Sequence, residues 1–258
     1  MFNLDGVLVP SAAIHAEAWK TAFDEFTGRW IERTGAPVAS FSIPVDYPRL
    51  VHGRTAVESV HEFLASRGLR LPDGNPDDEP GMETVNGLAN RKSGALLEVL
   101  TRRGAHPFEG ARLYLELVRD AGMRCAVASG STHMHMMLER ARLTPLVDAY
   151  VDGNTVRSER LRRKPAPDML LSACAHLGVG PERTVLFETT ADGVDAGRVG
   201  RFEFVVAVER DAEASTLRAH GADLVVTDLG ALLERQLAPG AVSLPGRNTV
   251  PRTGVVHT

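Results

Sequence analysis

The sequence predicts an α/β fold: a Rossmann-like parallel sheet covered by helices, with an all-helical segment inserted near its start. Short apolar, mostly β-branched runs recur after residue 105, and helical patterns separate several of them, as is typical of a parallel sheet buried on both faces. Residues 11–105 show helical periodicity and no convincing strand. The chain has 258 residues, 43% of them apolar, which suffices for one large core plus a smaller insert.

The first element is expected to be a short strand. Residues 1–9, MFNLDGVLV, indicate the end of a strand that runs into a turn at Gly6. Almost nothing precedes Asn3, whereas a buried strand usually has about 5–6 residues. Either this strand is stunted or the natural start lies upstream of Met1.

Three helices are expected next. Ser11 can cap the first of them, which carries apolar residues along one side. Apolar spacing predicts a second helix around residues 57–64 and a third around 85–100, and the polar, Pro/Gly-rich segment 71–81 lies between them. We therefore expect residues 11–105 to form an all-helical unit.

Five short runs supply the rest of the predicted sheet: RCAVAS (124–129), AYVDG (149–153), TVLFE (184–188), EFVVAV (203–208) and DLVVTD (223–228). Together with the first strand, they place the α/β core in residues 1–10 and 106–236. Ligands of such sheets bind beyond the carboxyl ends of the strands. Those ends carry the polar residues Asn3, Asp5, Ser129, Glu188 and Thr189.

The composition argues against several classes of protein. With 24% charged residues and a net charge of −4, the chain has no electrostatic footprint for nucleic acid or an anionic membrane. No apolar run approaches the roughly 20 residues that span a bilayer, and no secretory signal is visible.

Cys125 and Cys174 are expected to be buried free thiols, with a disulfide or metal pair as the alternative. We expect a cytoplasmic protein, monomer or homodimer, with a disordered tail at 237–258.

Four segments share a further pattern: FNLDGVL (2–8), VASGS (127–131), RRKPAPDML (162–170) and LFETTADGVDAGRVG (186–200). In order and spacing they resemble the four motifs of the haloacid dehalogenase (HAD) superfamily, with the helical insert directly after the first motif. AIHAEAWKTAF (13–23) and NGLANRK (86–92) are similar to the β-phosphoglucomutase-like subgroup. The resemblance implies a HAD core, a helical cap at 11–105 that closes over a sugar phosphate, and phosphatase or phosphomutase chemistry.

The central step of that chemistry is expected to be altered. In active relatives the first Asp attacks phosphorus, forms an aspartyl-phosphate and binds Mg²⁺ at the same time. Asn3 matches that position, and a carboxamide is a poor nucleophile and a weak ligand for a hard cation. We interpret Asn3 as a former catalytic position now used for hydrogen bonding. An engineered substitution and a repurposed site are the alternatives.

The resemblance assigns three further roles. Asp5 matches the general acid/base whose carbonyl also touches the metal, and its alternative role is to cap the turn that follows. Ser129, with Gly130 and Ser131, matches the phosphate-binding strand end, a role compatible with helix capping. Lys164 matches the lysine that neutralises the transferring group, and a surface lysine before proline is the alternative.

The resemblance also implies a weakened metal site. Glu188 matches the first member of the acidic pair at the fourth strand end, but Thr189 replaces the Asp that would bind Mg²⁺ directly. Glu188 and the Asp5 carbonyl are the remaining ligands, so Mg²⁺ binding is expected to be weak or absent. Lys164 then has less negative charge to oppose it, and we expect an anion to bind without metal.

On the cap, Arg54 can substitute for an arginine that this sequence lacks. Arg91 and Lys92 are candidates to hold a distal phosphate, or they belong to a solvated helix face. His15 and His133 can face the site or serve packing.

Three functions follow from these expectations. The first is a phosphatase or phosphomutase-type protein for a small phosphorylated, sugar-phosphate-like molecule, with impaired or altered catalysis. The second is a non-catalytic phospholigand-binding or regulatory protein. The third is a metal-independent enzyme that uses Asp5 or Glu188 as general acid/base in the same cleft.

Overall fold

A parallel sheet forms the centre of the fold. In the computed structural model, which describes residues 1–51, 54–210 and 212–237, six strands run in the order β3-β2-β1-β4-β5-β6. All neighbouring strands are parallel, which confirms the predicted α/β sheet. The strands are β1 (Phe2–Asn3), β2 (Ala126–Ala128), β3 (Ala149–Val151), β4 (Val185–Glu188), β5 (Phe204–Val208) and β6 (Leu224–Val226).

Strand β1 is the point at which the strand order reverses. It pairs with β2 through Phe2–Val127 and Asn3–Ala128, and with β4 through Phe2–Phe187. The loops after β1, β2 and β4 therefore leave the same edge of the sheet side by side. Ligands of open parallel sheets bind in the crevice at such a point.

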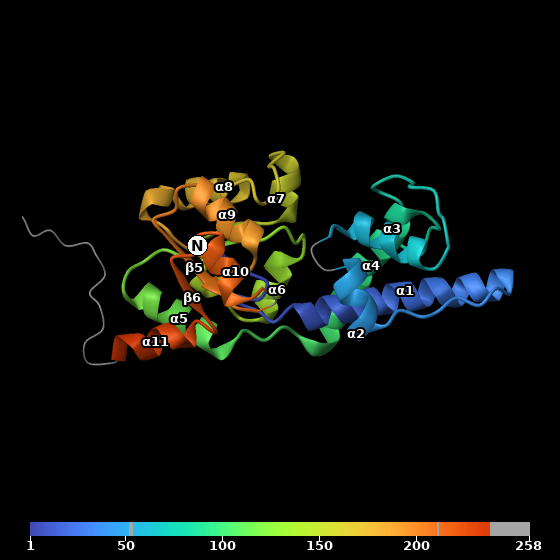
Figure 1. Ribbon diagram of the computed structural model, residues 1–258, viewed down its shortest axis with the longest axis horizontal. Coiled ribbons are helices and arrows are strands. Elements are labelled where there is room, and N and C mark those ends of the chain that lie inside the picture. The colour runs from blue at the N-terminus through green and yellow to red at the C-terminus, as the bar shows by residue number, and fades with distance from the viewer. Residues whose placement is uncertain (52–53, 211, 238–258) are drawn as a thin grey trace, which may run out of the picture.

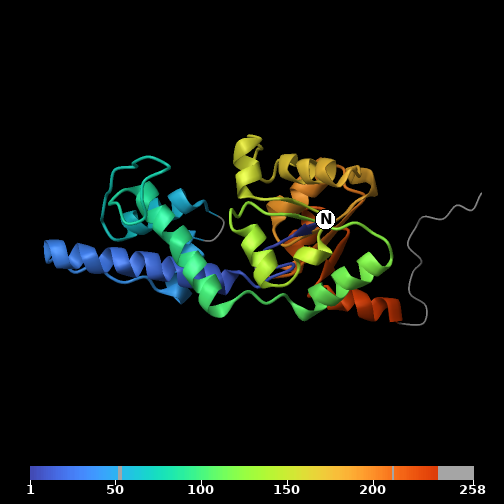
Figure 2. The ribbon, with the colours of Figure 1, turned by 180° about the vertical axis from the view of Figure 1, so that it is seen from behind.

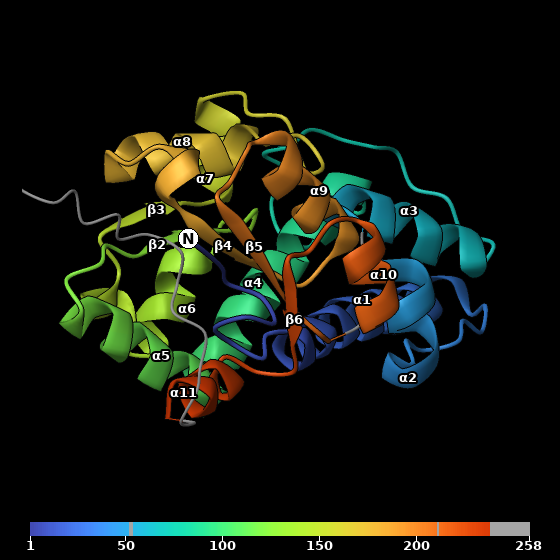
Figure 3. The ribbon, with the colours of Figure 1, turned by 60° about the vertical axis from the view of Figure 1, so that its left-hand side comes forward.

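Helices cover both faces of the sheet (Figure 3). One face carries α5 (Glu109–Asp120), α6 (Met134–Arg140) and α11 (Gly230–Leu237), and the other carries α8 (Asp168–Leu177), α9 (Ala191–Val199) and α10 (Ala214–Ala219). Because side chains alternate along a strand, β5 feeds both layers: Val206 and Val208 enter the first, Val205 and Ala207 the second. The remaining connections contain η2 (Thr144–Leu146), α7 (Gly153–Ser158) and η3 (Pro181–Arg183).

The segment between β1 and α5 has a hydrophobic core of its own. It contains α1 (Ala12–Thr34), α2 (Ile43–Asp46), the π-helical turn η1 (Tyr47–Val51), α3 (Ala56–Ser66) and α4 (Val85–Arg103). Phe23 stacks on Phe63 with ring centroids 3.8 Å apart and on Trp19 at 4.8 Å. Figures 1 and 2 show these helices beside the sheet. The three expected helices are present as α1, α3 and α4, whereas α2 and η1 are too short for periodicity to indicate.

Helix capping differs from the expectation at α1. Ser11 precedes the helix as predicted, but its side chain makes no capping hydrogen bond and donates to Asp5 instead. At α3, Thr55 and Glu58 form a reciprocal capping box that was not predicted.

Three other expectations concern the whole chain. Cys125 and Cys174 are buried free thiols, as expected. Within the described ranges, no helix is both long and apolar enough to cross a membrane. The tail predicted for 237–258 lies outside the described residues, apart from Leu237 at the end of α11.

Candidate active site

Asp5 lies in the turn that follows β1, where Gly6 adopts a left-handed φ of +75° that other side chains disfavour. The Asp5 carboxylate accepts hydrogen bonds from Ser11 Oγ and, at 3.2 Å, from Ser129 Oγ, and His15 Nε2 lies 3.7 Å from it. Burial alone would raise the pKa of Asp5, but these three contacts lower it to about 2. Asp5 is therefore an anion at neutral pH.

Arg210 braces the same turn. Its Nε donates to the Gly6 carbonyl at 2.8 Å and its Nη1 donates to the Thr227 carbonyl at 2.6 Å. The guanidinium also lies 4.2 Å from the ring centroid of Phe108. Arg210 thus ties the turn after β1 to the loop after β6, a role that the sequence did not indicate because Gly6, Phe108 and Thr227 are distant from it in the chain.

Two basic groups face Asp5 from the helical insert. Lys92 Nζ, on α4, lies 3.0 Å from His15 Nδ1, on α1, and 5.5 Å from the ring centroid of Trp19. Burial lowers the pKa of Lys92 to about 8, and burial together with the Lys92 charge lowers the pKa of His15. Lys92, which was expected to hold a ligand phosphate, and His15, which was expected to face the site or to serve packing, therefore lie together beside Asp5.

The loop after β2 is held in shape by its own hydroxyl groups. Ser129 Oγ accepts the Ser131 backbone N–H at 3.2 Å, and Ser131 Oγ accepts the His133 backbone N–H at 3.2 Å. A Cβ on Gly153 would lie 2.4 Å from the Gly130 carbonyl oxygen, so α7 begins in direct contact with this loop. Burial lowers the pKa of His133, and its Nε2 is a buried atom with no hydrogen-bond partner in the described structure.

At the end of β4, Glu188 and Lys164 form an ion pair. Glu188 is fully buried, and Lys164 Nζ donates to its Oε1. The carbonyl of Asp5 accepts hydrogen bonds from Asn3 Nδ2 at 3.2 Å and from Thr189 Oγ1 at 3.5 Å. Asn3 and Thr189 therefore both donate to the Asp5 carbonyl, the oxygen expected from the sequence to face a metal.

The residues around this carbonyl offer little to a divalent cation. Glu188, the carboxylate at the end of β4, is already paired with Lys164. Among the described residues, no three His, Cys, Asp or Glu side chains gather closely enough to bind a metal ion. Mg²⁺ needs several oxygen ligands in near-octahedral geometry, so the side chains present do not fit it well.

A cleft of about 1340 Å³ opens between this edge of the sheet and the helical insert. Its lining includes seven of the predicted site residues: Asn3, Asp5, Arg54, Lys92, Ser129, Gly130 and Ser131. Lys164, Glu188 and Thr189 do not line it and instead pack around the end of β4.

The two cap arginines lie in different settings. Arg54 lines the cleft and donates from Nη1 to the Arg49 carbonyl at 2.9 Å. Arg91 does not line the cleft, because its guanidinium binds Glu25 at 2.6 and 2.7 Å and Glu98 at 2.9 Å. Two arginines absent from the predicted set, Arg157 and Arg163, do line it.

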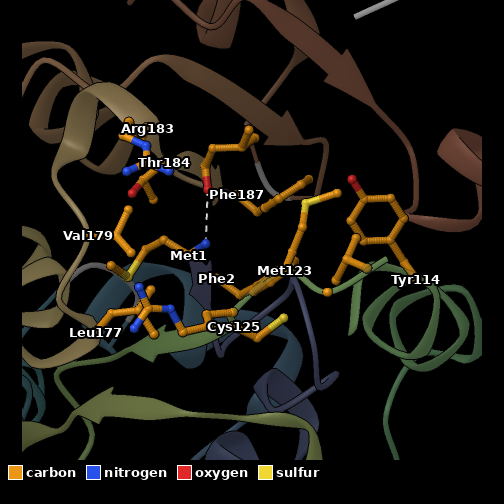
Figure 4. A pocket seen from close by; sticks show the side chains of 14 residues that line it. Met1, Phe2, Tyr114, Met123, Cys125, Leu177, Val179, Arg183, Thr184 and Phe187 are labelled. Atoms are coloured by element: carbon orange, nitrogen blue, oxygen red, sulfur yellow. Dashed lines mark hydrogen bonds between the residues drawn. The ribbon is translucent and has the colours of Figure 1, made fainter. Parts of the chain in front are cut away.

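A second cavity, of about 390 Å³, lies at the opposite edge of the sheet, where β1 begins (Figure 4). Apolar side chains such as Phe2, Leu177 and Phe187 line much of it, and the Met1 amino group donates to the Val185 carbonyl at 2.9 Å. None of the predicted site residues lines this cavity.

Comparisons with known proteins were made for the whole chain. A family model described as haloacid dehalogenase-like hydrolase matches residues 1–200. The chain is 44% identical over 236 residues to a β-phosphoglucomutase of Mycobacterium bovis, covering 90% of each chain. It is 24% identical over 218 residues to a phosphorylated carbohydrates phosphatase of Thermotoga maritima, covering 81% of this chain and 83% of that protein. The solved structure of β-phosphoglucomutase from Clostridium difficile superimposes with a TM-score of 0.65 at 20% identity, over 90% of this chain and 91% of that one.

Proposed function

The chain belongs to the haloacid dehalogenase-like hydrolases, in the β-phosphoglucomutase-like subgroup, and on this premise we propose that it binds a small phosphorylated, sugar-phosphate-like molecule while standard phosphoryl transfer is impaired or altered. Its relatives are named as a phosphomutase and a phosphatase, which supports a phosphate ester as the ligand. Residues 11–105 act as the helical cap over the cleft.

One observation carries the proposal. Asn3 Nδ2 and Thr189 Oγ1 both donate to the Asp5 carbonyl, and Lys164 is paired with Glu188. An amide cannot replace a carboxylate as the nucleophile at phosphorus, and two donors at a carbonyl compete with a cation for its lone pairs. Mg²⁺ binding is therefore weak or absent, and the aspartyl-phosphate route is closed.

The remaining groups suit an anion. In the loop 129–133, the backbone N–H groups of Gly130 and Thr132 have no acceptor among the described residues and offer donors at the base of the cleft, and Lys92 contributes a positive charge from the cap side. Asp5 is ionised and lines the cleft, so its carboxylate can orient a water or a hydroxyl group of the ligand by accepting a hydrogen bond, although a pKa of about 2 makes it a weak base.

Two alternatives use the same cleft. A non-catalytic phospholigand-binding or regulatory protein needs only the anion contacts. A metal-independent enzyme uses Asp5 or Glu188 as general acid/base, and the position of Asp5 in the cleft lining favours it over Glu188, which lies outside that lining and is paired with Lys164.

The test compares the natural chain with Asn3→Asp and with the double variant Asn3→Asp/Thr189→Asp. Phosphatase and phosphomutase turnover of sugar phosphates is measured with Mg²⁺, and phosphate binding is measured by calorimetry with and without EDTA. We expect the natural chain to bind phosphate equally well in EDTA and to show no turnover, and the double variant to gain Mg²⁺-dependent activity.

Ordinary turnover by the natural chain, about 1–10³ s⁻¹ for an enzyme, contradicts the proposal. Low-micromolar Mg²⁺ binding by the natural chain, or a phosphoryl group trapped on Asn3, contradicts it as well. Inertness of all three proteins despite phosphate binding favours the repurposed or regulatory alternatives.

A further inference from the structure

Three aromatic rings line the cavity at the start of β1. Phe2 and Phe187 stack with their ring centroids 4.6 Å apart, and the ring of Tyr114 meets both of them edge-on. Figure 4 shows Leu177 and Val179 on one side of Phe2 and Tyr114 on the other. The volume of about 390 Å³ lies near the lower end of the range for small-molecule pockets, about 300–1,000 Å³. The cavity therefore offers an apolar surface to one ring or a short hydrocarbon chain.

Two arginines complete the lining from the strands on either side of β1. Arg124 lies two residues before β2, and Arg183 lies two residues before β4. Because β1 lies between β2 and β4 in the sheet, the two arginines start from backbone positions roughly 10 Å apart, which is two strand spacings. Their long side chains can therefore reach the same ligand from opposite sides.

The charges of these arginines are available to a ligand. Among the described residues, neither guanidinium has an ion-pair or hydrogen-bond partner, and no aspartate or glutamate lines the cavity. The Asp148 carboxylate, which feels the charge of Arg124, already pairs with Arg119 at 2.7 Å. Burial lowers the pKa of the Met1 amino group to about 6, so at neutral pH the two arginines supply the positive charge of the cavity.

We propose that this cavity is a second binding site, for a small arylalkyl carboxylate whose ring packs on the aromatic lining while its carboxylate pairs with Arg124 and Arg183. A guanidinium binds a carboxylate through two parallel hydrogen bonds, and burial of the ring removes apolar surface from water. The inference goes beyond the proposed function and does not depend on it. The cavity and the cleft lie at opposite edges of the sheet and share no lining residue.

The test is a calorimetric titration of the whole chain at neutral pH with three probes: 3-phenylpropionate, its neutral analogue 3-phenylpropanamide, and acetate. We expect 3-phenylpropionate to bind with a Kd of about 1 mM or tighter. Its affinity should exceed that of the amide by about tenfold, because only the acid forms charge-assisted hydrogen bonds. Acetate should bind more weakly than 3-phenylpropionate, because it has no ring to bury.

Three variants separate the charge from the apolar surface. Arg124→Gln/Arg183→Gln should reduce the affinity for 3-phenylpropionate to that for the amide. Val179→Phe fills the cavity with a second ring and should abolish binding of both ring-containing probes, with circular dichroism as the check on folding. The matched control is Arg140→Gln on α6, where the side chain is exposed and does not line the cavity, and this variant should bind as the natural chain does.

Several outcomes overturn the second site and leave the proposed function untouched. The site is wrong if the natural chain does not bind 3-phenylpropionate, binds the acid and the amide equally, or keeps its preference in Arg124→Gln/Arg183→Gln. It is also wrong if Val179→Phe still binds the probe. Displacement of 3-phenylpropionate by saturating inorganic phosphate would place the probe in the cleft and would overturn the site as well.

Discussion

The pair formed by Lys164 and Glu188 sets the charge at the end of β4. Glu188 is fully buried, and the Lys164 side chain is 17% exposed, so water screens their attraction only weakly. A Cβ on Gly193 would lie 2.3 Å from Glu188 Oε2, so the start of α9 packs directly against this carboxylate. The pair therefore has structural value independent of any ligand.

Breaking this pair should destabilise the protein. Lys164→Met leaves Glu188 as an unpaired buried charge, and we expect a loss of about 3–5 kcal/mol in the free energy of unfolding. The double variant Lys164→Met/Glu188→Gln removes both charges and should recover part of that loss in urea denaturation. Equal stability of the natural chain and the single variant would show that the two groups do not interact as described.

An aromatic cluster, in which Phe23 stacks on Trp19 and Phe63, packs the helices of the insert against one another. Phe63 of α3 is fully buried and stacks on Phe23 of α1, while the capping box at Thr55 fixes where α3 begins. The separate core of this segment explains how a long insertion can leave the sheet undisturbed.

Truncation of one ring tests that cluster. Phe63→Ala should cost about 3–5 kcal/mol, because it removes a buried ring and leaves a cavity. The chain has 2 tryptophans, Trp19 and Trp30, and both lie on α1, so tryptophan fluorescence in denaturant reports on the insert. The matched control is Val57→Ala on the same helix, where the side chain is 37% exposed and the expected change is small. A similar loss in both variants would argue against the aromatic cluster as the main support.

At the scale of the whole molecule, the site exists only where the insert meets the sheet. Asp5 and Ser129 come from the sheet edge, whereas His15 and Lys92 come from α1 and α4. The charge that Lys92 brings to the cleft depends on burial, since burial lowers its pKa to about 8 from an ordinary value of 10.5. The protonated form is the one that attracts an anion.

Ligand affinity should therefore fall as pH rises through about 8, where free Lys92 loses its proton. Sugar phosphates are already fully ionised in that range, since their second pKa is about 6, so the ligand does not contribute to the decline. The decline should approach about tenfold per pH unit at most.

Lys92→Arg keeps its charge and should preserve affinity for glucose 6-phosphate up to pH 10, as measured by calorimetry. Lys20→Arg, a change on α1 where Lys20 pairs with Asp24, serves as the control and should follow the natural chain. An identical pH profile for the natural chain and Lys92→Arg would exclude Lys92 from ligand binding.

The sequence by itself determined the parallel sheet, the three principal insert helices α1, α3 and α4, and the identity of the residues at the strand ends. Apolar β-branched runs separated by helical patterns indicate a parallel sheet with both of its faces buried. In a parallel sheet all carboxyl ends lie at one edge, and Ser129, Asn3 and Glu188 lie there, at the ends of the neighbouring strands β2, β1 and β4. The amide at position 3 and the hydroxyl at position 189 were likewise evident from residue type alone.

Only the tertiary structure decided which side chains meet. Ser11 binds Asp5 rather than capping α1, and Arg91 pairs with glutamates while Arg157 and Arg163 reach the cleft. Local spacing predicts which way an element faces, but it does not measure competition among partners that lie far apart in the chain. That competition is settled by burial and by charge pairing in three dimensions, which is why the fold was predicted more completely than the site.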